Sequence, residues 1–95
     1  MDDETKQPPR IDFTTFLVSL GSSAFVHLGD APHPETGKPE VNLPLAHQTI
    51  DLLALLREKT RGNCTPEEDH VFETLLTDLR LRYVEKTTGA GGTAG

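Results

Sequence analysis

The sequence has no tryptophan, one cysteine and one tyrosine among its 95 residues. A single cysteine excludes a disulfide within the chain and fits a reducing compartment. The phosphate-binding patterns GxxxxGKS, GxxxxGKT and GxGxxG are absent, and so is the CxxC spacing of many zinc sites. We therefore expect no cofactor.

Positive charge is also scarce. Nine Lys and Arg residues stand against fifteen Asp and Glu residues, which gives a net charge of −6. This balance repels a phosphate backbone, so we expect no nucleic-acid partner. The N-terminal sequence MDDETKQPPR lacks the basic stretch followed by an apolar core that a secretory signal requires.

The longest stretch without a formal charge runs from Phe13 to Gly29. Its length touches the lower limit for a membrane span, but its Ser, Thr and Gly residues and His27 make it too polar for one. We expect a cytoplasmic protein without a membrane span.

Proline, glycine and capping residues divide the chain into three helical segments. Asp12 can cap a first helix that Gly29 ends, and Asn42 can cap a second that ends before Gly62. Thr65, followed by Pro66 and by Glu68 three residues on, has the pattern of a capping box. The sequence predicts an all-α fold with helices at about 12–28, 43–61 and 66–86.

The connections between these helices differ in length. Only residues 62–64 separate the second and third helices, which predicts an antiparallel hairpin with the first helix packed across it. Residues 30–42 carry three prolines and form a long loop. Residues 12–86 are thus expected to form a single domain, between a disordered arm at 1–11 and a flexible Gly-rich tail at 87–95.

The second helix carries more apolar surface than one neighbour can cover. Its apolar residues form two adjacent bands that span about half of the helix or more, against a stripe of roughly 100° on an ordinary surface helix. We expect oligomerisation to complete this packing. One band comprises Leu43, Ala46, Ile50, Leu53 and Ala54, and the other comprises Leu45, Thr49, Leu52 and Leu56.

The first helix has a second surface beside its main apolar stripe. There, two apolar side chains flank small residues that allow another backbone to approach closely. A contact with another chain is one interpretation; a loop that covers the strip, or a helix that Gly21 merely weakens, are the others. This candidate interaction surface comprises Thr14, Val18, Gly21, Ser22 and Phe25.

In combination, three segments resemble a bacterial family of uncharacterised proteins, domain-of-unknown-function family 1844. They are FTTFLVSLGSSAFVHLGD, VNLPLAHQTIDLLALLREKTRGN and the stretch from TPEED to LLTDLRLRYVEKT. The resemblance covers roughly residues 12–87 and implies a small, cytoplasmic, mostly helical protein with no known activity. In that family a Leu commonly follows the Gly-Asn of the turn, where this chain has Cys64. This difference argues against a shared thiol function.

No group of residues predicts catalysis or metal binding. The four histidines and Cys64 do not pair with one another at helical spacing, and Glu67, Glu68 and Asp69 stand where a helix start already accounts for them. We expect no enzyme. The leading hypothesis is an oligomeric interaction or adaptor module, a homo-oligomer of two or more copies that also accepts another protein. The alternative is a binder of small molecules or lipids with a pocket between the first and second helices.

Overall fold

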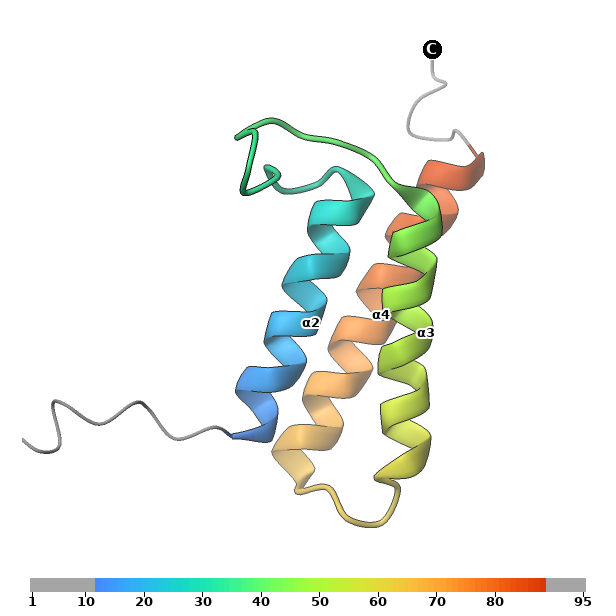
Figure 1. Cartoon of the computed structure of the whole chain (residues 1–95). Coiled ribbons are helices and arrows are strands. Elements are labelled where there is room, and N and C mark those ends of the chain that lie inside the picture. Colours follow the sequence, from blue (N-terminus) through green and yellow to red (C-terminus); the bar gives the residue numbers. More distant parts are fainter. Residues whose placement is uncertain (1–11, 89–95) are drawn as a thin grey trace, which may run out of the picture.

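The computed structural model describes residues 12–88, and in this range it contains three helices and no strand. Helix α2 spans Phe13–Leu28, α3 spans Leu43–Lys59 and α4 spans Pro66–Thr88. Figure 1 shows α2 and α4 running in one direction and α3 running in the other. The predicted all-α class and the antiparallel α3–α4 hairpin are confirmed.

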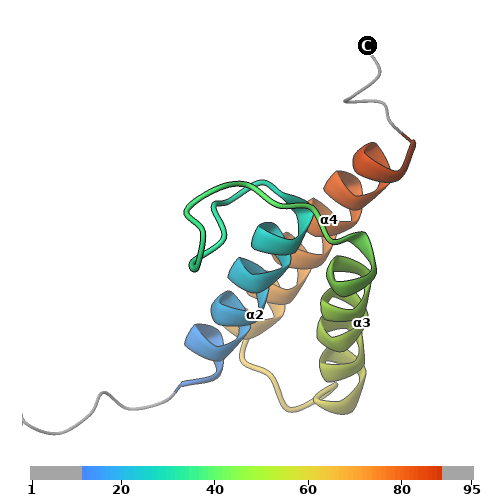
Figure 2. The ribbon, with the colours of Figure 1, turned by 45° about the horizontal axis from the view of Figure 1, so that its top comes forward.

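Helix α2 contacts both α3 and α4, which confirms the predicted packing of the first helix across the hairpin, and it does so within one chain. Figure 2 shows α4 behind the pair formed by α2 and α3. No helix among residues 12–88 is long and apolar enough to cross a lipid bilayer. The predicted arm at 1–11 lies outside the described residues, and so does the part of the predicted tail at 89–95.

The helix starts follow the capping residues of the sequence. The Asp12 carboxylate accepts a hydrogen bond from the Thr15 amide at 2.8 Å, and the Asn42 side chain accepts one from the Leu45 amide at 3.1 Å. At α4, Thr65 and Glu68 each donate an amide hydrogen to the side chain of the other, at 2.8 and 3.1 Å, which completes the capping box. These side chains satisfy amide groups that have no partner inside a helix.

The helix ends differ slightly from the prediction. Helix α3 ends at Lys59 rather than at residue 61, because the Thr60 carbonyl already accepts a hydrogen bond from the Asn63 amide in the turn. Helix α4 continues to Thr88, beyond residue 86 and into the predicted tail. Hydroxyl groups of Thr87 and Thr88 donate to the Val84 carbonyl at 3.1 and 2.8 Å, which stabilises this last turn.

The core is an apolar seam to which each helix contributes a single stripe. Its residues recur at helical spacing, so one side of each helix faces the seam. Burying a large apolar side chain stabilises the fold by roughly 1.5–3 kcal/mol. The buried apolar residues are Leu17, Ala24, Leu28, Ala46, Ile50, Leu53, Phe72, Leu76 and Leu79.

The three helices meet around the ring of Phe72, which is fully buried. Phe13 of α2 packs edge-on against this ring, with the centroids 5.7 Å apart. Arg57 of α3 places its guanidinium 5.7 Å from the same centroid. One aromatic side chain of α4 therefore contacts both of the other helices.

The proline-rich connection turns back onto the end of α2. The Asn42 amide donates to the His27 carbonyl at 2.7 Å, and Gly29 adopts a left-handed backbone with a φ of 83°. A Cβ on Gly29 would lie 2.7 Å from Cγ2 of Val41. Glycine at this position therefore serves both the helix end and the close approach of the returning chain.

Replacing Gly29 by Ala should destabilise the fold by about 2–3 kcal/mol, because Ala adopts a left-handed backbone at a cost and also overlaps Val41. Gly62 is the matched control, since its φ is 87° and a Cβ added there would have no neighbouring atom within 4 Å. Gly62→Ala should lower the free energy of unfolding only by the cost of placing Ala in a left-handed backbone, about 1–2 kcal/mol. Urea unfolding followed by circular dichroism measures both; equal costs would show that the Val41 contact adds nothing.

Candidate interaction face

Helix α2 carries no Asp, Glu, Lys or Arg anywhere between Phe13 and Leu28. Its buried positions face the core, and its exposed positions hold only Ser, Thr and apolar residues. Surface helices of soluble proteins usually place charged residues opposite the buried stripe. The exposed residues of α2 are Thr15, Phe16, Val18, Ser19, Ser22 and Ser23.

The register of α2 determines which residues lie beside α3. Gly21 packs against Leu75 of α4, so one flank of the buried stripe faces α4. Phe16 and Leu20 occupy the other flank, which lies beside α3. Phe16 is 44% exposed, and Leu20 is half-buried against the core.

Helix α3 likewise has one flank that faces α4 and an opposite flank that does not. His47 and Arg57 lie on the flank that reaches α4, where His47 meets Tyr83 and Arg57 meets Glu73. The opposite flank carries the predicted second band. Of that band, Leu45 and Leu52 are 40% and 41% exposed, and Leu56 is half-buried.

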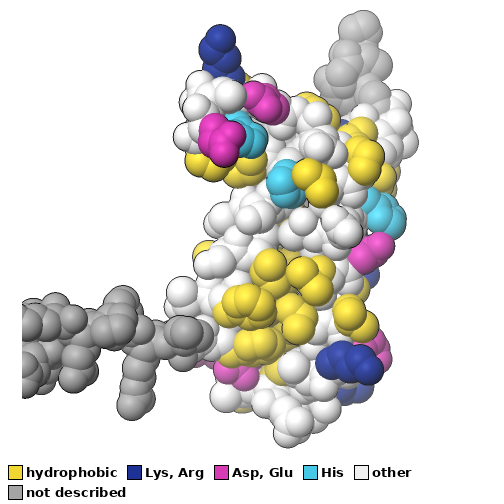
Figure 3. Space-filling view, in the orientation of Figure 1, with side chains coloured by type: hydrophobic (Ala, Val, Ile, Leu, Met, Phe, Trp, Pro, Cys, Tyr) yellow, Lys and Arg dark blue, Asp and Glu magenta, His cyan; other side chains and the backbone are white. Residues whose placement is uncertain are grey.

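Together these flanks form the α2–α3 face, which we define as Phe16, Leu20, Leu45, Leu52 and Leu56. Figure 3 views the molecule with α2 and α3 in front and shows hydrophobic side chains gathered over them, with no charged side chain inside the cluster. The predicted first band of α3 supplies Ala46, Ile50 and Leu53 to the core. Of the second band, Leu45 and Leu52 are left exposed by the chain's own helices.

The predicted surface on the first helix is not a single open strip. Gly21 is buried, and a Cβ there would lie 2.7 Å from Cδ2 of Leu75. Phe25 is half-buried, with the Arg82 guanidinium 5.0 Å from its ring centroid. Val18 is 48% exposed and Ser22 is exposed. A contact of Val18 and Ser22 with another chain stays a prediction.

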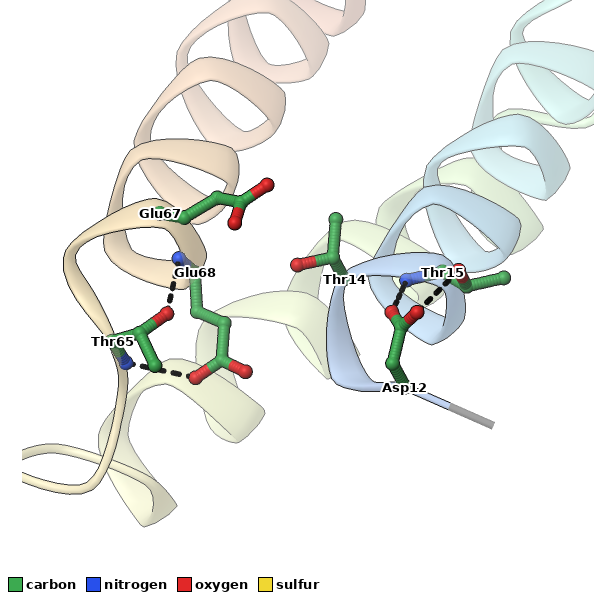
Figure 4. A pocket seen from close by; sticks show the side chains of 6 residues that line it. All are labelled: Asp12, Thr14, Thr15, Thr65, Glu67 and Glu68. Atoms are coloured by element: carbon green, nitrogen blue, oxygen red, sulfur yellow. Dashed lines mark hydrogen bonds between the residues drawn. The ribbon is translucent and has the colours of Figure 1, made fainter. Parts of the chain in front are cut away.

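Thr14, the remaining residue of that surface, lies at the other end of α2. It lines a shallow cavity of about 310 Å³ between the starts of α2 and α4 (Figure 4). Two acidic residues of this cavity, Asp12 and Glu68, are already engaged as helix caps. Helix capping therefore accounts for both of these carboxylates.

An ion cluster lies where the end of α2 meets α4. The Asp30 side chain is 19% exposed; its carboxylate lies 2.9 Å from Nζ of Lys86 and 3.1 Å from Nη1 of Arg82. Arg82 also pairs with Asp78, four residues before it on α4, at 2.9 Å. Burial raises the pKa of Asp30, but hydrogen bonds and charges from Lys86 and Arg82 outweigh burial and lower it below its ordinary value.

The groove between α3 and α4 contains a pair that sequence reasoning missed. His47 Nδ1 lies 3.1 Å from an Asp51 oxygen, and the Tyr83 ring stands edge-on to the imidazole with centroids 5.4 Å apart. The spacing of four residues between His47 and Asp51 was the available signal. The cavity there has a volume of about 310 Å³, and its lining residues include no Ser, Thr or Cys.

The remaining candidates for chemistry are the thiol of Cys64 and side chains that could bind a metal ion. Cys64 is half-buried, and its Sγ lies 3.2 Å from Oγ1 of Thr60 in the turn between α3 and α4. Among residues 12–88, no three His, Cys, Asp or Glu side chains stand close enough to hold a metal ion. The α2–α3 face is therefore the candidate interaction surface that we consider further.

The fold and this face define a small all-α protein, a helical hairpin with a third helix packed on it and one apolar side left open. A family model described as a domain of unknown function (DUF1844) matches residues 10–85, and the chain belongs to this family. No curated protein and no solved structure matches the chain.

Replacing Gly21 by Leu should destabilise the folded chain by about 1–3 kcal/mol, because the new side chain overlaps Leu75 across the α2–α4 contact. Ser22→Leu is the matched control, since Ser22 is the next residue and is exposed. It should leave stability within about 0.5 kcal/mol of the original. Thermal unfolding compares the two variants, and similar melting temperatures would count against the close approach at Gly21.

Replacing Asp30 by Asn should cost about 1 kcal/mol at neutral pH, because the variant loses two charged hydrogen bonds. The folded pKa of Asp30 is lowered, so its contribution is complete above the ordinary value of 3.8 and is lost as the pH falls through the folded value. The stability difference between the two proteins should therefore shrink below about pH 4. Glu85→Gln, which removes an exposed carboxylate without an ion pair among residues 12–88, is the control; a difference that persists unchanged into acid would contradict the assignment.

Proposed function

We propose that this protein is a self-associating helical interaction module in the cytoplasm, that its α2–α3 face is the contact surface and that it has no catalytic activity. The observation that carries the proposal is that this face combines exposed Phe16, Leu45 and Leu52 with a helix that has no formal charge. Contiguous apolar surface of this kind marks interaction sites in soluble proteins.

The occupant we propose is a second copy of the chain. Two copies carry the same net charge of −6 and repel each other wherever charged surfaces meet. An uncharged face avoids this repulsion and needs no complementary charge pattern on its partner, so it can pair with itself about a two-fold axis.

The size of the face indicates the kind of contact it can form. A pair of helices of this length, about 24 Å, with axes about 8–10 Å apart, presents a surface about 20 Å wide, or about 480 Å². This is below the roughly 800 Å² per partner of a standard interface and is in the range of weak or transient contacts. We therefore expect a dimer that forms at micromolar rather than nanomolar concentration.

Binding of a small molecule or lipid between α2 and α3 has less support. The side chains that both helices direct into the core are tightly covered: Leu17, Ala24, Ala46 and Leu53 have no exposed surface. A ligand there would have to displace packed side chains, which costs several kcal/mol.

The test is the mass of the protein in solution. Sedimentation at tens of micromolar should give a dimer or larger assembly for the original chain and a monomer for Leu52→Glu, because the substitution places two new charges in a desolvated contact. Leu81→Glu is the matched control: Leu81 lies on α4, away from the face, and is 57% exposed. It should leave the mass unchanged.

A monomeric original chain would overturn the proposal. An assembly that Leu81→Glu disrupts and Leu52→Glu leaves intact would place the contact on α4 instead of on the α2–α3 face. Circular dichroism of each variant shows that the helices remain folded, since both replaced side chains are partly exposed and lie outside the core.

A further inference from the structure

Two rows of exposed residues run along the α2–α3 face, one on each helix. Asp12, Phe16 and Ser23 follow one another at intervals of four and seven residues, so they lie on one side of α2 from its N-cap onward. Intervals of seven residues keep the second row on one side of α3 in the same way. The members of this second row are Leu45, Leu52 and Lys59. Each row therefore continues the apolar face and ends in one charge.

A hydrogen bond fixes the height of one row relative to the other. The Asn42 amide donates to the His27 carbonyl at 2.7 Å, so the end of α2 and the start of α3 lie at one level. At the rise of an α-helix, Asp12 lies about 22 Å from this level along α2, and Lys59 lies about 26 Å from it along α3. The carboxylate and the ammonium group therefore mark the same end of the face. Figure 3 shows acidic and basic side chains below the hydrophobic cluster, on the α2 side and the α3 side respectively.

The other members of the two rows also match in height. Phe16 and Leu52 lie about 15–17 Å from the level of that hydrogen bond, and Ser23 and Leu45 lie about 5–6 Å from it. The face thus has a charged level at one end, a level with two large apolar side chains next to it, and a level with one Ser and one Leu toward the other end.

Neither terminal charge is neutralised within the described chain. The Asp12 carboxylate accepts hydrogen bonds from the amide and the hydroxyl of Thr15, at 2.8 and 3.3 Å, but forms no ion pair among residues 12–88. Lys59 has no ion-pair partner in this range either, whereas Arg57, Arg61 and Arg82 all have one. Both charges are therefore available to a second molecule at the edge of the apolar face.

A two-fold axis that lies in the contact and runs parallel to the helices keeps every residue at its own level. Since α2 and α3 run in opposite directions, α2 of one copy then packs antiparallel on α3 of the other (Figure 1). Phe16 meets Leu52 of the second copy, and Asp12 meets Lys59 of the second copy. The apolar contact and the ion pair each form twice. Antiparallel packing also opposes the helix dipoles, which is favourable.

A two-fold axis that crosses the helices reverses the levels instead. Helix α2 would lie on α2 and α3 on α3, so Phe16 would meet Ser23 rather than a large apolar side chain. Asp12 would lie over the last turn of α2, and Lys59 would lie over the first turn of α3. Helix α2 has no Lys or Arg, and the first turn of α3 has no acidic residue. The two rows therefore favour the axis that runs parallel to the helices.

We propose that α2 of each copy packs on α3 of the other about a two-fold axis parallel to the helices, with Asp12 of each copy paired with Lys59 of the other. This inference rests on the proposed function, since it requires self-association through the α2–α3 face. It adds the direction and the register of that contact.

The experiment is a double-mutant cycle on the ion pair, with the association constant measured by sedimentation. Asp12→Asn keeps a side-chain oxygen that caps α2 and removes the charge. It should lower the association constant about fivefold, because each dimer loses two exposed ion pairs. Lys59→Gln should lower it by a similar factor. The double variant should associate no more weakly than either single variant, since each of them already removes both pairs.

Two matched substitutions separate the ion pair from the change in net charge. Glu85→Gln removes an exposed carboxylate from α4, and Arg80→Gln removes an exposed guanidinium from the same helix. Because the chain carries a net charge of −6, Glu85→Gln reduces the repulsion between copies and should leave the association constant equal or slightly higher. Asp12→Asn changes the net charge by the same amount, so a lower constant for it identifies the lost pair. Arg80→Gln should weaken association less than Lys59→Gln does.

A second measurement tests the register by disulfide cross-linking. In a Cys64→Ser background, a mixture of Ser23→Cys and Leu45→Cys chains should form a mixed dimer under mild oxidation, because the two positions share a level on facing helices. A mixture of Ser23→Cys and Phe16→Cys chains is the matched control, since these positions meet only if α2 lies on α2. Mass spectrometry identifies which chains are linked.

The outcomes separate the two proposals. A monomeric original chain overturns both the function and the arrangement. A dimer that Leu52→Glu disrupts, but that Asp12→Asn and Lys59→Gln leave as strong as their charge-matched controls, overturns the arrangement alone. Linking of Ser23→Cys to Phe16→Cys in preference to Leu45→Cys also overturns it and places the axis across the helices.

Discussion

The packing of the fold depends on the environment of Phe72. The ring is fully buried, touches Phe13 of α2 edge-on and lies beneath the guanidinium of Arg57 of α3. Nη1 of Arg57 is itself buried and has no hydrogen-bond partner among residues 12–88, while Nη2 reaches Glu73 at 3.4 Å. The negative face of the ring is therefore the main compensation for that buried N–H group. The position of each helix around α4 is coupled to this one contact.

A core organised around a single ring and one stripe per helix buries a limited amount of apolar surface. A chain of this length buries only about 60–65% of the surface of its unfolded form. Gly21 allows α2 and α4 to approach closely, and this approach directs Phe16 and Leu20 away from α4 and toward the outside of the α2–α3 pair. The exposed apolar face is thus a consequence of how tightly the opposite side of α2 packs.

Local signals in the sequence predicted the elements well, whereas the partners of each apolar band were harder to predict. Asp12, Asn42 and Thr65 cap the helices as their positions indicate, because a cap involves only neighbours within a few residues. Periodicity correctly indicated two bands on α3, but it does not say which band faces a helix of the same chain. The contact at Gly21 is with α4 of the same chain. The pair formed by His47 and Asp51 was missed because its significance comes from Tyr83, which is adjacent only after α3 and α4 have folded together.

Apolar burial and net charge have different roles in the proposed association. Apolar burial is non-directional, so the α2–α3 face supplies affinity but allows several registers and both directions. Long-range repulsion between two chains of charge −6 makes most other surfaces unsuitable. In the proposed association the uncharged face therefore supplies the affinity, while the net charge of the chain disfavours contacts through its other surfaces.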